Sequence, residues 1–186
     1  MFCALLAVTS FVPKISPASV KNYPGITKPF GFWDPLNLSK DVSEGRFKFY
    51  REAELKHGRV AMLAALGFPI AEQFHPLWGG NIDVPSYVAF QQTPLQTFWP
   101  IVVALISAVE LKSVKNFEDI FDKGEPWSLR DTYEAGNLNF DPLKLKPSDP
   151  IELESLQNKE INNGRLAMGS IAVMVLQELL TGDKLF

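Results

Sequence analysis

The chain has 186 residues, which suits one compact domain, and its formal net charge is −3 at pH 7. A mildly acidic chain lacks the basic surface on which nucleic-acid binding depends, so nucleic acid is excluded as a partner. Cys3 is the only cysteine, which excludes an intrachain disulfide. Hydrophobic residues make up 46% of the sequence, a fraction that fits a soluble or a membrane protein.

The N-terminal stretch, residues 1–10, is apolar and short, and it lacks the basic start of a complete signal peptide. The residues that follow, 12–28, contain lysine and serine but no aspartate or glutamate. This composition is typical of a targeting segment or a surface tail. We therefore expect residues 1–28 to be an N-terminal targeting or surface segment and residues 29–186 to form the folded domain.

A first long helix is predicted over about residues 43–74. Its centre carries the sequence ELKHGRVAM, which begins at Glu54, and an uncharged run follows over residues 60–71. Alanine, leucine and methionine are frequent in this run, and all three are good helix formers. Pro69 lies near the end of the run and is expected to kink the helix.

A middle helix is predicted over about residues 98–115, after an irregular connection at residues 79–97. The helix is apolar up to Glu110. A carboxylate near a helix end has a plain structural explanation, which is an ion pair with Lys112 or Lys115 on the same helix.

A third helix is predicted over about residues 150–180, with Asp149 as its N-cap and Pro150 at its first position. This helix carries EINNGRLAM, which begins at Glu160 and repeats the first motif. Both copies read Glu-x-x-(His/Asn)-Gly-Arg-(Val/Leu)-Ala-Met, and a shorter echo precedes each copy, FWDPL and then FDPL. A single internal duplication predicts two elements related by a pseudo-two-fold axis.

The charges in the two motifs need partners if these helices span a membrane. Each motif is followed by an uncharged run of twelve residues, about 18 Å of helix, whereas a bilayer core is about 30 Å thick. Spanning helices would carry the charged turns into the membrane, where unpaired charges are costly. If the helices cross about a two-fold axis, Glu54 meets Arg165 and Glu160 meets Arg59. The alternative is a pair of solvated helix starts with ordinary surface charges.

Single nitrogen and oxygen donors also recur along the two helices, at His57, Asn163 and Gln177. No cluster supplies the three or four convergent ligands of a protein zinc site, so no metal site built by the protein alone is expected. Isolated donors suit a metal that arrives already chelated and needs one axial ligand, as the magnesium of chlorophyll does. The alternative is that each donor makes a hydrogen bond between helices.

The two motif copies match the Glu-x-x-His-x-Arg and Glu-x-x-Asn-x-Arg signatures of the chlorophyll-binding light-harvesting complex superfamily, which the chain resembles from about residue 30 onward. The resemblance implies an all-α membrane protein with three transmembrane helices, the first and third crossed about a pseudo-two-fold axis. It also implies that Glu54 and Glu160 ligate chlorophyll magnesium while each is paired with the opposite arginine.

The resemblance implies further chlorophyll ligands at His57, Asn163 and Gln177, and at Glu110 through its Ala-Val-Glu context. His75, at the exit of the first helix, is either another ligand, as in some chlorophyll c-binding relatives, or a surface histidine before a turn.

The function that the resemblance implies is a non-enzymatic antenna, integral to the thylakoid membrane of a plastid. Such a protein binds chlorophylls and carotenoids, contacts thylakoid lipids, a photosystem core and neighbouring antenna subunits, and passes excitation to the photosystem. The short loops, the FHP exit of the first helix and the plastid-type TSFVP near the start resemble red-lineage algal antennas. They imply chlorophyll a, chlorophyll c and fucoxanthin or a related xanthophyll, with photosystem I as the expected partner.

Two other functions fit the sequence. A photoprotective member of the same superfamily would quench excitation instead of harvesting it. A pigment-free helical scaffold or transporter would use the Glu–Arg pairs for structure alone.

Overall fold

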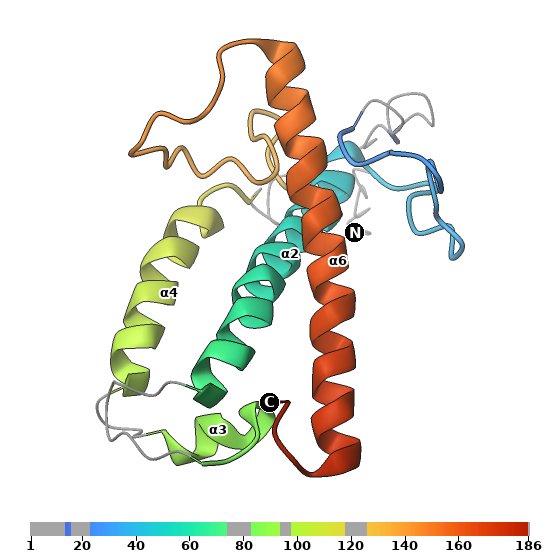
Figure 1. The fold of residues 1–186 in the computed structure, drawn as a ribbon. Helices are drawn as coiled ribbons and strands as arrows, with labels where there is room; N and C mark the ends of the chain where they lie inside the picture. Colours follow the sequence, from blue (N-terminus) through green and yellow to red (C-terminus); the bar gives the residue numbers. More distant parts are fainter. Residues whose placement is uncertain (1–13, 16–22, 74–82, 94–97, 118–125, 186) are drawn as a thin grey trace, which may run out of the picture.

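The computed structural model describes residues 14–15, 23–73, 83–93, 98–117 and 126–185. Within these ranges the chain forms four helices and no β-strand: α2 (Glu44–Gln73), α3 (Ser86–Gln92), α4 (Phe98–Val114) and α6 (Pro150–Thr181). Figure 1 shows α2 and α6 passing across each other, with α4 beside them and α3 at one end of the molecule. The bounds of the three long helices agree with the sequence predictions to within one residue at each end.

Helix α6 begins and ends where its sequence predicts. Asp149 Oδ1 accepts a hydrogen bond from the backbone N–H of Ile151 at 3.3 Å, and Gly182 ends the helix in the left-handed conformation at φ 73°. In the described part of the chain, α6 is the one helix that is long and apolar enough to cross a membrane. Only 17% of the residues in its apolar window are buried, whereas the core helix of a soluble protein is mostly buried.

Helices α2 and α6 approach each other closely at two glycines. A Cβ atom added at Gly58 would lie 3.1 Å from Cα of Gly164, and one added at Gly164 would lie 3.0 Å from Cα of Gly58. A side chain at either position would press on backbone, which cannot move aside as a flexible side chain can. The two glycines hold the same place in the two motif copies, so the duplicated glycine sets how closely the helices cross.

Helix α4 stands apart from the other helices. None of its Cα atoms lies within 8 Å of a Cα atom in α2, α3 or α6. Its apolar side chains are largely exposed, among them Leu105 at 65% and Leu111 at 67%. Among the described helices, none packs its backbone against α4.

Few hydrophobic side chains are buried in the described residues. They are Leu55, Ala61, Leu129, Ile161 and Ala167. A soluble domain of similar size buries roughly 70% of the surface that its unfolded chain exposes, most of it apolar. This protein instead leaves most of its large apolar side chains uncovered, so another apolar material must cover them.

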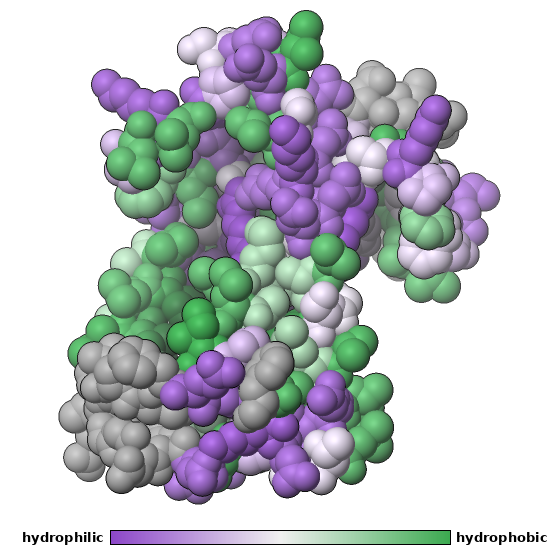
Figure 2. Space-filling view, in the orientation of Figure 1, coloured by the Kyte–Doolittle hydropathy of each residue, from purple (hydrophilic) through white to green (hydrophobic). Residues whose placement is uncertain are grey.

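The exposed apolar residues form a belt on the face shown in Figure 2. Hydrophobic residues gather over the middle of the helices, and hydrophilic residues lie above and below them. Polar ends that flank an apolar middle fit the hydrocarbon core of a bilayer and its two interfaces.

Residues 23–28 pack on the helix crossing. Asn162 Nδ2 on α6 donates to Thr27 Oγ1 at 3.1 Å, and the backbone N–H of Gly25 donates to the side chain of Asn158. The boundary expected after residue 28 leaves these residues outside the domain, whereas the structure holds them against α6.

The prediction of an irregular connection over residues 79–97 is wrong for residues 86–92, which form α3. This short helix contains tyrosine, valine and phenylalanine, which are weak helix formers, so its sequence gives little helical signal. Contacts from other helices hold it instead: the backbone N–H of Tyr87 donates to Glu178 Oε2 at 2.9 Å, and Ser86 Oγ donates to Glu72 Oε1 at 3.0 Å.

The glycine contact makes a testable prediction about helix packing. Gly58→Ala should destabilise the protein by about 1–3 kcal/mol, the usual range for overpacking, because the added methyl group meets the backbone of α6. Thermal unfolding in detergent, followed by far-ultraviolet circular dichroism, measures the change.

Gly67→Ala in the same helix is the matched control, because an added Cβ at Gly67 meets no atom within 4 Å. It should stabilise α2 by about 0.5–1 kcal/mol through the ordinary helix preference of alanine. Equal effects of the two substitutions would show that the crossing does not depend on close contact at Gly58.

Candidate functional site

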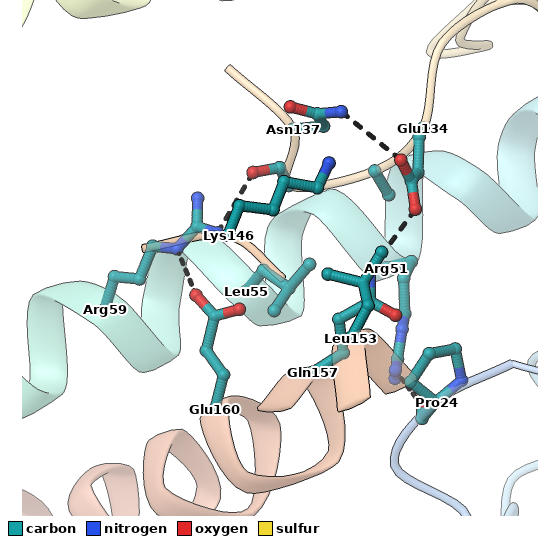
Figure 3. Close-up of a pocket in the computed structure, with 12 residues that line it drawn as sticks. Pro24, Arg51, Leu55, Arg59, Glu134, Asn137, Lys146, Leu153, Gln157 and Glu160 are labelled. Carbon is teal, nitrogen blue, oxygen red and sulfur yellow. Dashed lines mark hydrogen bonds and ion pairs between the residues drawn. The ribbon is translucent and has the colours of Figure 1, made fainter. Parts of the chain in front are cut away.

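Two ion pairs join α2 to α6 at the crossing. Arg59 Nε lies 2.8 Å from Glu160 Oε1, and Arg165 Nε lies 2.7 Å from Glu54 Oε1. Each pair takes its carboxylate from one motif copy and its guanidinium from the other. The structure thus brings together the partners that the repeat suggests, and Figure 3 shows the Arg59–Glu160 pair beside its pocket.

Each arginine of these pairs also binds the backbone of a loop glycine. Arg165 Nη1 donates to the carbonyl of Gly25 at 2.6 Å, and Arg59 Nη2 donates to the carbonyl of Gly136 at 3.0 Å. Both glycines have positive φ, 95° and 83°, which side chains rarely allow. Each arginine therefore binds one carboxylate and one loop, and the arrangement is repeated on the two sides of the crossing.

Side-chain packing against the two glycines repeats as well. A Cβ atom added at Gly25 would lie 2.6 Å from Ile161, and one added at Gly136 would lie 2.6 Å from Leu55. Leu55 and Ile161 each follow the motif glutamate of their own helix by one position. The roles of the two glycines were not expected from the sequence, although each glycine lies a few residues before an echo motif.

The echo motifs also fold alike. Asp34 accepts hydrogen bonds from the backbone N–H groups of Leu38 and Ser39, both at 2.9 Å. Asp141 accepts from the corresponding N–H groups of Leu145 and Lys146, at 3.0 and 2.9 Å. The bond from the Ser39 side chain lowers the pKa of Asp34 most, and the backbone bond from Lys146 lowers the pKa of Asp141 most. Both carboxylates thus cap tight turns that lead toward the motif helices.

The two sides of the crossing differ at one position. Arg51 Nη1 lies 3.0 Å from Glu54 Oε2, so two arginines occupy the two oxygens of Glu54. The corresponding position before Glu160 is Gln157, and Glu160 Oε2 makes no hydrogen bond within the described residues. Glu54 therefore lies in a more positive environment than Glu160.

Open pockets border both ion pairs. A cavity of about 780 Å³ lies beside Glu54 and Arg165 and is walled by Phe30 and Trp33. A smaller one, about 210 Å³, lies beside Arg59 and Glu160 (Figure 3). Each carboxylate thus faces space that a bound group can enter.

A third groove, of about 510 Å³, runs along the apolar faces of α2 and α6. His57 lies in it, and its Nδ1 is 2.7 Å from the carbonyl of Ala53. A carbonyl only accepts, so Nδ1 carries the proton and Nε2 keeps a free lone pair. This is the tautomer that an imidazole needs in order to ligate a metal through Nε2.

Asn163 and Gln177 are exposed, and their side chains make no hydrogen bond within the described residues. Amides without partners on apolar helices are costly in a membrane unless something binds them. The other explanation was a hydrogen bond between helices, but neither amide has such a partner in the described part of the chain. The two amides and His57 therefore fit groups that ligate an exogenous metal.

Glu110 has a partner that was not expected from the sequence. Lys56 Nζ on α2 lies 2.7 Å from Glu110 Oε2, whereas neither Lys112 nor Lys115 pairs with this carboxylate. Its second oxygen, Oε1, makes no hydrogen bond within the described residues. His75 lies outside the described residues.

Three further charged side chains, which the sequence did not single out, follow one stripe of α2, at Lys48, Glu52 and Lys56. Lys48 and Glu52 are 8% and 3% exposed. The spacing of four residues between these opposite charges is the sequence signal that could have identified them as a group. Among the described residues, no group of three or more His, Cys, Asp or Glu side chains is placed to hold a metal ion.

Comparison with known proteins gives the family. A family model described as "Chlorophyll A-B binding protein" matches residues 19–179. The chain is 45% identical over 176 residues to light-harvesting complex stress-related protein 3.2 of Chlamydomonas reinhardtii, covering 91% of this chain and 67% of that protein.

It is 38% identical over 191 residues to a fucoxanthin-chlorophyll a-c binding protein of Isochrysis galbana, covering 97% of this chain and 90% of that protein. It is 34% identical over 190 residues to a chlorophyll a-b binding protein of Petunia hybrida, covering 88% of this chain and 68% of that protein. With these matches across the motif helices and the pockets beside them, the chain belongs to the chlorophyll a–b binding protein family.

Proposed function

We propose that this protein is a light-harvesting antenna that binds chlorophylls and carotenoids and transfers excitation to a photosystem. As a member of its family, it is an integral protein of the chloroplast thylakoid membrane. Its function on this proposal is to hold pigments at fixed distances and orientations, and it catalyses no reaction.

The observation that carries the proposal is the exposed apolar surface around α4. No Cα atom of α4 lies within 8 Å of another described helix, and Leu105 and Leu111 are about two-thirds exposed. Lipid can cover the outer side of α4. On this proposal chlorophyll rings, which are flat and apolar, lie between α4 and α2. On this proposal α2, α4 and α6 all cross the membrane.

The residues proposed to hold chlorophyll are donors that border open space. Within the described residues Glu160 has one oxygen without a hydrogen bond, and Glu54 has lone pairs that its two arginines leave available. His57 presents Nε2 into the groove between α2 and α6. The remaining proposed ligands are Asn163, Gln177, Glu110 and His75. When bound, the chlorophylls supply the light absorption.

The relatives support the proposed pigment types. The 38% identity to a fucoxanthin-chlorophyll a-c binding protein extends over nearly the whole chain and supports chlorophyll a, chlorophyll c and fucoxanthin or a related xanthophyll. The general likeness to red-lineage antennas supports photosystem I as the acceptor of excitation, with thylakoid lipids and neighbouring antenna subunits as further partners.

A second candidate function is photoprotective quenching. It is favoured by the 45% identity to a stress-related light-harvesting protein over 91% of the chain. Antennas and quenchers hold the same kinds of pigment, so the two functions differ in the fate of the excitation and not in the site.

Energy transfer inside the purified, pigmented protein tests the proposal. An excitation spectrum of chlorophyll a fluorescence should show the bands of the carotenoid and of chlorophyll c, because energy absorbed by both reaches chlorophyll a. A long fluorescence lifetime supports harvesting, and a short one supports quenching. A protein that elutes colourless from gel filtration would contradict both functions.

A substitution separates charge pairing from ligation at Glu54. Glu54→Gln keeps an oxygen that can ligate magnesium but leaves Arg165 and Arg51 without their carboxylate. The side chains of the Glu54–Arg165 pair are 29% and 43% exposed, so we expect a loss of about 1–3 kcal/mol, between the ranges for exposed and buried pairs. Thermal loss of pigment circular dichroism measures it.

Two variants serve as controls. His57→Leu removes a ligand but strands no charge, so it should lower the melting temperature less than Glu54→Gln does. Glu160→Gln strands Arg59 alone, because Gln157 stands where Arg51 does on the other side, and its effect should fall between the two. A Glu54→Gln protein as stable as the parent would rule out a structural role for the crossed ion pair.

A further inference from the structure

Lys56 connects α2 to α4 across the space between them. Its Nζ lies 2.7 Å from Glu110 Oε2 and 2.8 Å from Ser113 Oγ. No Cα atom of α4 lies within 8 Å of α2, so this long side chain bridges a gap that backbone packing does not close.

The two contacts of Lys56 lie on one face of α4. Glu110 and Ser113 are three residues apart and therefore point in nearly the same direction from the helix axis. Ser113 is 2% exposed, and it is the one buried residue of α4. A single attachment lets a helix rotate about its own axis, whereas two attachments on one face restrict that rotation.

The C-terminal end of α4 has a second anchor. The backbone N–H of Arg130 donates to the carbonyl of Asn116 at 3.0 Å, and Phe117 forms a bridge with Leu129. These contacts lie beyond the last turn of α4, so they fix where the helix ends.

Glu52, one turn before Lys56 on α2, helps to hold the lysine side chain in place. Glu52 Oε1 lies 3.9 Å from Lys56 Nζ, and Glu52 Oε2 accepts hydrogen bonds from Tyr133 Oη at 3.1 Å and the backbone N–H of Gly136 at 2.5 Å. Glu52 is buried and bonded to Tyr133 and Gly136, so it is a fixed acidic neighbour of Lys56 Nζ. The same Nζ binds a second acid, Glu110, on α4.

We propose that Lys56 is a positioning residue that sets the rotation of α4 and so holds the Glu110 carboxylate on the side of α4 that faces α2. It thereby gives Glu110 a charge partner from another helix, as Arg165 and Arg59 do for the motif glutamates. The claim that Glu110 then ligates chlorophyll rests on the proposed function, whereas the claim about helix rotation does not.

The test measures two properties of the pigmented protein: the distance between spin labels on α4 and α6, and the number of bound chlorophylls. Spin labels are placed through Lys112→Cys on α4 and Lys159→Cys on α6, both exposed, in a Cys3→Ser background. Lys56→Met should broaden the distribution of distances between the labels and cost the chlorophyll held by Glu110. Lys56→Arg should keep both properties, because arginine retains the charge and the donors.

Lys115→Met is the matched control, since it removes an exposed lysine at the same end of α4 and should change neither measurement. Ser113→Ala removes one of the two contacts while leaving the ion pair, so it should broaden the distances less than Lys56→Met. It also serves as the test if Lys56→Met does not assemble.

An unchanged distance distribution in Lys56→Met, or in Ser113→Ala where that variant replaces it, overturns the proposal. A broadened distribution with an unchanged chlorophyll count supports the positioning role of Lys56 and contradicts the assignment of Glu110 as a ligand.

Discussion

The close approach of α2 and α6 at Gly58 and Gly164 is the contact on which the other features of the site depend. It brings the arginine of each motif within bonding distance of the other helix's glutamate, at 2.7 and 2.8 Å. Unpaired charges are costly in a membrane, and the crossing places each carboxylate where the guanidinium of the other helix pairs with it. His57 lies in the groove along the apolar faces of the two crossed helices, and Gln177 is exposed on α6.

The duplicated motif predicted the long helices and both ion pairs because helix bounds and charge partners leave periodic signals in the sequence. Other features left weaker signals. Gly25 and Gly136 offer their carbonyls to the arginines only once the loops are folded over the crossing. The helix α3 is held by Glu178 and Glu72 from other elements, and its own residues do not favour a helix. The role of Lys56 was not predicted because its partner Glu110 lies on α4, which carries no copy of the duplicated motif.

Helix α4 shows how far the polypeptide alone determines the architecture. Contacts beyond its last turn fix its C-terminal end, and Lys56 binds one of its faces, but none of the other described helices packs along it. Protein interiors are normally close-packed, so a space beside an apolar helix has to be filled. We infer that pigment fills this space, and that the helices act as a frame whose donors point into the spaces that the pigments take.

A crystallographic density map of the pigmented protein tests this inference most directly. It should show chlorophyll rings between α4 and the α2–α6 pair, with magnesium bonded to His57 Nε2 and to the side chain of Gln177, and the crossing at Gly58 and Gly164 unchanged. A map in which α4 packs directly against α2, with no pigment between them, would contradict it.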